Sequence, residues 1–507
     1  MQMFELSNVV TMLIHLLQRF DHELSILSAL AFLVLVGSAV VQGVRLLWCA
    51  TFCASESVAW TARSRSSYFS TFALLVLALE LPSFLFHSSE GLADLIQGTD
   101  PRLNEILELV PSIRQGPSPP LLFRNRHIQF IPWLIQNEIH RQEGIPFQRI
   151  HVEVTDCPDK MTDCNPHLGR TMTDTITLDV FPPFDDQSIF SEGFNKSSPV
   201  ILFSPGLRCY SQDMPGNMII RKAYDKGFRS IVVNRRGHTP YQTLKSPRWN
   251  LFGDVDDLEQ VYWYVKNELV TNDTAMFLHG ISSGTSVTVT ALSKWDRRRI
   301  EEPNRRTPVF VSCISITPGY DISKVMNRER FLFPYNDILL GGVKDHFVIQ
   351  NEVLLRSYNS EAVDKILSAT SLQDLVDAAV PFAGYDNTTL YYEDTNPINK
   401  VSDITTPKLV LNAIDDPCCN IANLYERSPY PRHGGKTFAQ MIGETENGMV
   451  AVARTGSHCP FLCGRNRWLP FVRDPLNGGW MLNSWADEVS IEFYRATLDV
   501  YGDRRFL

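Results

Sequence analysis

The composition of the chain limits its possible folds and partners. The chain has 507 residues, of which 44% are hydrophobic and 20% are charged, which is typical of a globular protein and excludes a largely disordered one. The formal net charge is −9 and no concentrated basic stripe is present, so we expect no nucleic-acid partner. A chain of this length forms one large domain with additional segments, or two to three domains.

Two hydrophobic runs near the N-terminus predict a membrane anchor. Residues 24–44 carry no charged side chain and are long enough to cross the hydrocarbon core of a bilayer as a helix. A cleaved signal peptide is the alternative, although this run is longer than the usual signal core and starts well after the first methionine. Residues 66–86 form a second run with Glu80 and Pro82 near its end, and they either cross the membrane or lie at its interface. We therefore expect residues 1–90 to anchor the chain.

The side of the membrane that holds the rest of the chain depends on the number of crossings. Arg45, Arg63 and Arg65 lie between the two runs and favour a cytoplasmic position for that loop. Two crossings would place the C-terminal part in a lumen or outside the cell, and one crossing would leave it in the cytoplasm. We expect an integral protein of an endomembrane such as the endoplasmic reticulum, with the bilayer as a partner.

The remainder of the chain predicts an α/β domain. Residues 91–120 end in QGPSPP, which is typical of a linker, and the domain is expected over residues 121–507. Acidic residues beginning at Asp254 precede apolar positions at helical spacing. Residues 323–400 are rich in helix formers and aromatic side chains and predict a helical cap insertion. Short apolar runs closed by turn residues predict a mostly parallel central sheet with helices on both faces, with strands at residues 199–203, 229–234, 274–278, 309–316 and 408–412.

The third of these runs leads into a motif that is typical of a nucleophilic serine. Ser282 lies in the sequence G-x-S-x-G, between a predicted strand and a predicted helix. A serine that projects its hydroxyl from a sharp turn crowds its neighbours, so Gly280 and Gly284 are expected to form the nucleophile elbow. The alternative is a glycine-rich turn with a passive serine.

A serine nucleophile needs a base, and the base needs an acid that orients it. Asp416 follows the fifth predicted strand, and His458 follows Asp416 in a turn of small residues, so the order is serine, acid, histidine. Asp415 is the competing acid, which we expect to brace the loop. His433 is the competing histidine, and it lies only a short loop beyond the aspartates. The predicted triad is therefore Ser282, Asp416 and His458, with residues 121–507 as the catalytic domain.

Backbone amides are expected to bind the negative charge that such a reaction develops. The Ser283 amide lies at the start of the helix after the nucleophile, and the Leu207 amide follows Gly206 in the loop after the first predicted strand. We expect neither a metal nor a cofactor, because the chain has no C-x-x-C zinc pattern and no phosphate-binding glycine loop. Cys157 and Cys164 either form a disulfide or remain free thiols.

Several short motifs occur together in the chain, at residues 125–129 (NRHIQ), 204–207 (SPGL), 227–237, 256–258 (DDL), 391–392 (YY), 411–417 (LNAIDDP) and 456–458 (GSH). Together they resemble the YheT-like branch of the α/β-hydrolases, which includes membrane-anchored lipases. The chain departs from the family pattern at Ser283, where the family carries methionine, and at Pro460, where it carries glycine.

The resemblance implies an α/β-hydrolase fold and a serine esterase or lipase. Its expected substrates are small esters or lipids, most of all acylglycerols and phospholipids, cleaved through an acyl-enzyme. An acyltransferase with the same triad is one alternative, and a catalytically inactive, membrane-tethered binding protein is another. A peptidase is a third, because a fold does not determine a substrate.

Overall fold

The computed structural model describes the chain between residues 90 and 502 with short gaps. The chain divides into two units, Met1–Phe86 and His87–Leu507, and every described residue belongs to the second. Both hydrophobic runs, the segment with Cys157 and Cys164, and their predicted roles lie outside the described residues. No helix in the described part is long and apolar enough to cross a membrane. The described residues are 90–120, 123–129, 133, 136, 144–155, 173–184, 188–212, 216–239, 242–332, 335–464 and 470–502.

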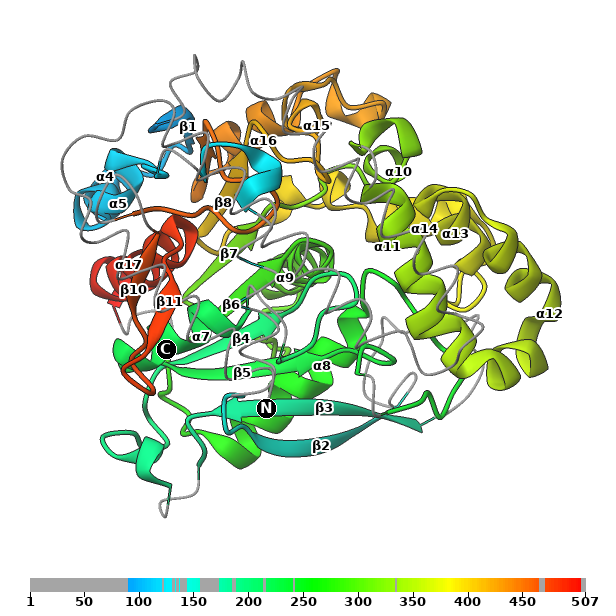
Figure 1. Ribbon diagram of the computed structural model, residues 1–507, viewed down its shortest axis with the longest axis horizontal. Helices are drawn as coiled ribbons and strands as arrows, with labels where there is room; N and C mark the ends of the chain where they lie inside the picture. The colour runs from blue at the N-terminus through cyan, green and yellow to red at the C-terminus, as the bar shows by residue number, and fades with distance from the viewer. Residues whose placement is uncertain are drawn as a thin grey trace, which may run out of the picture. The chain divides into compact units, whose positions relative to one another are not determined.

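A nine-stranded sheet forms the centre of the described part (Figure 1). The six strands β4 to β9 are parallel to their neighbours among these six, and β1, β3 and β2 are antiparallel to the strands beside them. The expected mostly parallel sheet is therefore confirmed. Across the sheet, the strands lie in the order β1 (Leu92–Gln97), β9 (Gly448–Ala453), β8 (Lys408–Ala413), β7 (Ser312–Ile316), β6 (Met276–Ile281), β4 (Val200–Ser204), β5 (Arg229–Asn234), β3 (Thr173–Phe181) and β2 (Gln148–Thr155).

The five apolar runs picked out in the sequence are the strands β4, β5, β6, β7 and β8. Every residue of these strands is buried, which explains why they read as continuous apolar runs without alternation. Their side chains still alternate between the two faces, because Ile201 and Phe203 join one core cluster and Val200 and Leu202 join another.

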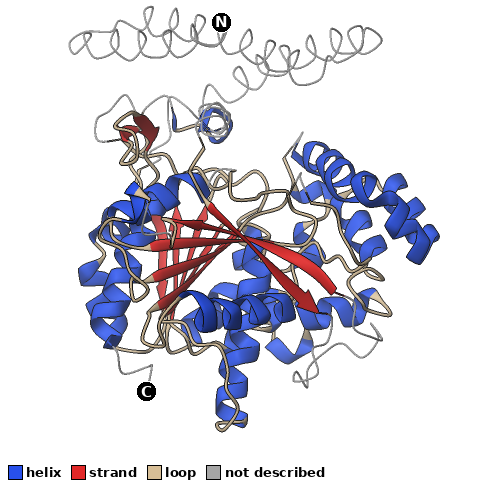
Figure 2. Cartoon of the chain, turned by 90° about the horizontal axis from the view of Figure 1, so that it is seen from below, coloured by secondary structure: helices blue, strands red, loops and turns tan. Residues whose placement is uncertain are grey.

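Helices cover both faces of the sheet (Figure 2). On one face, the core contains side chains from α4 (Arg102–Leu109), α5 (Pro111–Gln115), α7 (Gly216–Asp225) and α17 (Trp485–Tyr501). On the other face, the cores contain side chains from α8 (Val255–Tyr264), α9 (Gly284–Glu301) and α16 (Phe438–Glu444). The helix expected after Asp254 is α8, and Asp254 occupies its N-cap position.

The prediction of a linker over residues 91–120 is wrong. This segment forms β1, α4 and α5, and β1 pairs with β9 at the edge of the sheet. Leu103, Ile106 and Ile113 are fully buried in the core beneath α17. The spacing of these apolar residues is that of an amphipathic helix, and only the final residues of the segment have the composition of a linker.

The segment between β7 and β8 is helical, as the sequence predicts for residues 323–400. Its side chains enclose a hydrophobic cluster of their own, which also takes in Trp249 and Phe252 from the loop before α8. In Figure 1 these yellow-green helices lie to one side of the sheet. They are α10 (Ile322–Val325), α11 (Tyr335–Val343), α12 (Glu352–Ser368), α13 (Leu372–Ala379) and α14 (Thr388–Thr395).

Three shorter elements lie between β8 and the end of α17. Helix α15 (Ala422–Tyr425) follows β8, and a two-stranded sheet of β10 (Phe471–Arg473) and β11 (Trp480–Leu482) precedes α17.

The burial of Ile106 gives a direct test of the corrected segment. Ile106→Ala should lower the free energy of unfolding by about 2–5 kcal/mol, because it removes apolar volume from a packed core. Ile300→Ala is the matched control, since Ile300 is 69% exposed, and it should change that free energy by about 0.5 kcal/mol or less. Urea unfolding followed by circular dichroism measures both. Equally small effects would make residues 91–120 a linker after all.

Candidate active site

Ser282 lies in the tight turn between β6 and α9. Its backbone φ is +51°, a left-handed conformation that is strained for a residue with a side chain. Its amide donates to the carbonyl oxygen of Ile316 at 2.8 Å, which ties the turn to β7. A Cβ atom at Gly284 would lie 2.1 Å from the carbonyl oxygen of Ser204, and one at Gly280 would lie 2.6 Å from Thr288 Oγ1. Neither elbow position has room for a side chain.

His458 reaches Ser282 from the loop that follows β9. Its Nε2 lies 2.9 Å from Ser282 Oγ. The loop bends sharply, because Ser457 and Cys459 on either side of the histidine have φ values of +56° and +79°. A Cβ atom at Gly456 would lie 2.3 Å from the ring of Phe461, so the close packing of this loop requires glycine there.

Asp416 holds the opposite side of the His458 ring. His458 Nδ1 lies 2.9 Å from Asp416 Oδ2 and 3.1 Å from Oδ1. The amides of Cys418 and Cys419 each donate to Asp416 Oδ1 at 2.8 Å. These two amides fix the buried carboxylate, and residue patterns alone did not reveal them, because their direction depends on the fold of the loop.

Asp415 has a different place from its neighbour. Its Oδ1 accepts from the amides of Gly456 and Ser457 at 2.9 Å each, and its Oδ2 accepts from the hydroxyl of Thr455. It therefore braces the histidine loop, while Asp416 contacts the histidine itself. His433 is hydrogen-bonded to Ser428 instead, with 2.6 Å between Nδ1 and Oγ. The structure thus brings together the three side chains of the predicted triad.

Two opposing effects set the pKa of His458. Burial disfavours the charged imidazolium and lowers the pKa, whereas the negative charge and hydrogen bond of Asp416, together with the neighbouring Cys459 thiol, raise it. The raising contributions are larger in sum, so the pKa lies well above its ordinary value of 6.5.

The loop after β4 lies against the nucleophile. A Cβ atom at Gly206 would lie 3.2 Å from Ser282 Cβ, which places the backbone before Leu207 beside the serine. Within the described ranges, neither the Leu207 amide nor the Ser283 amide donates a hydrogen bond to the protein. Both amides therefore remain available to an oxygen atom bound near Ser282.

One group of side chains in the described residues has donors suited to a metal ion. Atoms of Asp416, Cys419 and His458 lie within 4.8 Å of one another. Both carboxylate oxygens of Asp416 and both ring nitrogens of His458 already take part in the hydrogen bonds given above. We therefore assign no metal to this group.

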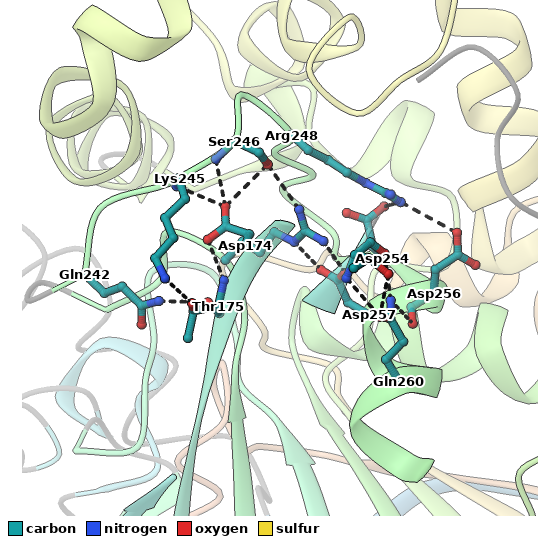
Figure 3. Close-up of polar contacts among 12 residues, drawn as sticks. Asp174, Thr175, Gln242, Lys245, Ser246, Arg248, Asp254, Asp256, Asp257 and Gln260 are labelled. Atoms are coloured by element: carbon teal, nitrogen blue, oxygen red, sulfur yellow. Dashed lines mark hydrogen bonds and ion pairs between the residues drawn. The ribbon is translucent and has the colours of Figure 1, made fainter. Parts of the chain in front are cut away.

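A cavity among the described residues lies away from Ser282. It has a volume of about 420 Å³ and lies beside α9, where Ser286 and Lys294 line it, and its walls contain none of the three triad residues. Arg248 also lines this cavity, and Figure 3 shows it between Asp254 and Asp256, with 3.0 Å from Arg248 Nη2 to Asp254 Oδ1. The arginine and the two aspartates balance one another's charge, and no triad residue lies in this cavity. We therefore identify the active site from the triad.

Sequence comparisons point to α/β-hydrolases, although no family model matches the chain. Monoacylglycerol lipase ABHD2 of Danio rerio is 24% identical over 334 residues, which cover 64% of this chain and 68% of that protein. An abhydrolase domain-containing protein of Dictyostelium discoideum is 21% identical over 64% of this chain and 71% of its own length. Phospholipase ABHD3 of Mus musculus is 25% identical over 43% of this chain and 50% of its own length.

The sheet, the elbow and these similarities agree with one another. A serine turn at the carboxyl end of a parallel strand, followed in the chain by an aspartate and a histidine, is the arrangement of one fold family. The chain has the α/β-hydrolase fold. The solved α/β hydrolase GrgF of Penicillium sp. sh18 is 16% identical over 62% of this chain and 91% of its own, with a TM-score of 0.34, which is too low to add to this conclusion. Assignment to the YheT-like branch stays a prediction.

The pKa of His458 predicts how the reactivity of Ser282 changes with pH. Only neutral imidazole can accept the serine proton, so labelling by a fluorophosphonate should be slow at low pH and rise through a midpoint above 6.5. Asp416→Asn removes the charge that raises the pKa, so the midpoint should move to lower pH and the rate should fall by about 10⁴-fold. Labelling rates measured across this pH range test both. A wild-type midpoint at or below 6.5, or a midpoint unmoved by Asp416→Asn, would contradict this account of the histidine.

Proposed function

We propose that this α/β hydrolase is a serine hydrolase that cleaves carboxylic esters. The observation that carries the proposal is the continuous chain of hydrogen bonds from Ser282 through His458 to Asp416, with distances of 2.9 Å at each step. A hydroxyl, an imidazole and a buried carboxylate in this order can generate a nucleophile at neutral pH without a metal or cofactor.

The proposed reaction proceeds through an acyl-enzyme. Ser282 attacks the ester carbonyl carbon while His458 takes the serine proton, and the carbonyl oxygen becomes an oxyanion between the Leu207 and Ser283 amides. The intermediate collapses, and His458 returns the proton to the leaving alcohol. Water, deprotonated by His458, then attacks the acyl carbon and forms a second tetrahedral intermediate. This intermediate collapses with cleavage of the bond to Ser282 Oγ, His458 returns the proton to that oxygen, and the carboxylic acid leaves. Asp416 orients the imidazole and stabilises its charged form throughout.

The proposed substrates are lipid esters of the acylglycerol or phospholipid type. The relatives named monoacylglycerol lipase and phospholipase support this class. The hydrophobic runs at residues 24–44 and 66–86 support a membrane location, for which we propose an endomembrane. An anchor of this kind would keep the site next to acyl lipids, which have a negligible concentration in water.

Replacing the nucleophile tests the proposed function. Ser282→Ala should lower ester turnover by about 10⁴-fold or more and abolish fluorophosphonate labelling, because it removes the hydroxyl that forms the acyl-enzyme and reacts with the probe. Ser286→Ala is the matched control, since Ser286 lies one turn further along α9 and lines the separate cavity, and it should keep both activities. Turnover of monoacylglycerol and phosphatidylcholine by the purified full chain is measured by mass spectrometry. Labelling or turnover that survives Ser282→Ala would remove Ser282 from the mechanism.

A further inference from the structure

A buried arginine lies directly behind the loop that follows β4. Arg235, the first residue after β5, donates from Nη2 to the carbonyl oxygens of Pro205 at 3.0 Å and Gly206 at 3.2 Å. The same nitrogen lies 3.2 Å from Ser283 Oγ, and Nη1 donates to the carbonyl oxygen of Leu251 at 3.1 Å. One guanidinium therefore joins the β4 loop, the nucleophile elbow and the loop before α8.

Arg235 differs from the next residue in how its charge is balanced. Arg236 forms two hydrogen bonds with the carboxylate of Asp257, at 2.6 and 2.7 Å. In the described part of the chain, no carboxylate lies within ion-pair distance of Arg235. Asp254 is the nearby acid, and Figure 3 shows it paired with Arg248. Burial lowers the pKa of Arg235 to about 10, so it remains a cation at neutral pH.

The position of the guanidinium determines where the Leu207 amide points. The carbonyl of Gly206 and the amide of Leu207 belong to one planar trans peptide, so they point in opposite directions. With the carbonyl held by Arg235, the amide faces away from the guanidinium. Gly206 itself lies against Ser282. The contact to Ser283 Oγ joins this peptide to the residue that carries the second proposed oxyanion donor.

We propose that Arg235 is a positioning residue that orients the Leu207 amide toward the oxyanion and places an unneutralised positive charge behind it. This inference rests on the proposed ester hydrolysis. Negative charge develops on the substrate oxygen only as the tetrahedral intermediate forms, so a fixed cation and a fixed amide dipole lower the barrier more than they strengthen substrate binding. Arg235 does not touch the substrate and acts through the peptide that it holds.

Two variants separate this role from that of a simple structural anchor. Arg235→Gln keeps an amide donor and loses the charge, and Arg235→Lys keeps the charge but cannot form the full set of hydrogen bonds. Arg235→Gln should lower kcat by about 10²-fold, as the loss of one oxyanion donor does, while KM changes by less than about threefold. The kcat of Arg235→Lys should be about tenfold higher than that of Arg235→Gln, because the lysine restores the positive charge.

A substrate with altered oxygen chemistry supplies the deciding measurement. Steady-state rates are measured with an aryl ester and with the matching thionoester, in which sulfur replaces the carbonyl oxygen and accepts hydrogen bonds weakly. Because the oxyanion donors favour oxygen, the ratio of ester to thionoester kcat should fall by about tenfold in Arg235→Gln. A general loss of order in the site would lower kcat equally for the ester and the thionoester, and the ratio of the two would stay unchanged.

The possible outcomes are distinct. An unchanged ratio in folded Arg235→Gln, or equal losses in the glutamine and lysine variants, would overturn the proposal. If Arg235→Gln does not fold, as judged by circular dichroism, the ratio in Arg235→Lys decides, and a wild-type ratio there would overturn the proposal as well. Absence of turnover and of fluorophosphonate labelling in the wild-type chain would instead contradict the proposed function, and the role of Arg235 would be discarded with it.

Discussion

The site depends on the fact that parallel strands present their carboxyl ends at one edge of a sheet. The loops after β4, β6, β8 and β9 all leave from that edge, and they carry Gly206, Ser282, Asp416 and His458 in turn. Residues that are 176 positions apart in the chain thus come within hydrogen-bond distance. These loops are then held by contacts of their own, from backbone amides at the aspartates to a buried guanidinium at the loop after β4. The strained backbone at Ser282 is tolerated because the sheet and α9 fix both sides of the turn.

Features encoded in short stretches of the chain could be predicted from its sequence. The elbow needs glycines at fixed positions, because their Cβ atoms would meet the backbone of β4 and the first turns of α9. The five apolar runs correspond to β4 to β8, since strands buried on both faces carry continuous apolar residues. The choice of Asp416 over Asp415 follows from its place directly before Pro417, where the loop is expected to turn back toward the histidine. The structure places Asp416 at His458 and Asp415 at the loop that carries it.

Features that depend on distant partners could not be predicted in this way. Strand β1 is short and only half-buried, and its register is set by β9, which lies more than 350 residues away in the chain. Arg235 looks like a surface residue in the pair Arg235-Arg236, because its hydrogen-bond acceptors are backbone carbonyls whose positions exist only in the folded loop. The amides of Cys418 and Cys419 are hidden from residue patterns for the same reason. Side-chain chemistry therefore locates the triad, while the shape of its surroundings follows from tertiary structure.

A crystal structure of the full chain after reaction with an alkyl fluorophosphonate tests the central claim most directly. The account predicts a covalent bond from phosphorus to Ser282 Oγ, with the phosphoryl oxygen within hydrogen-bond distance of the Leu207 and Ser283 amides and His458 still paired with Asp416. Phosphorus attached to another residue, or a phosphoryl oxygen turned away from both amides, would contradict it.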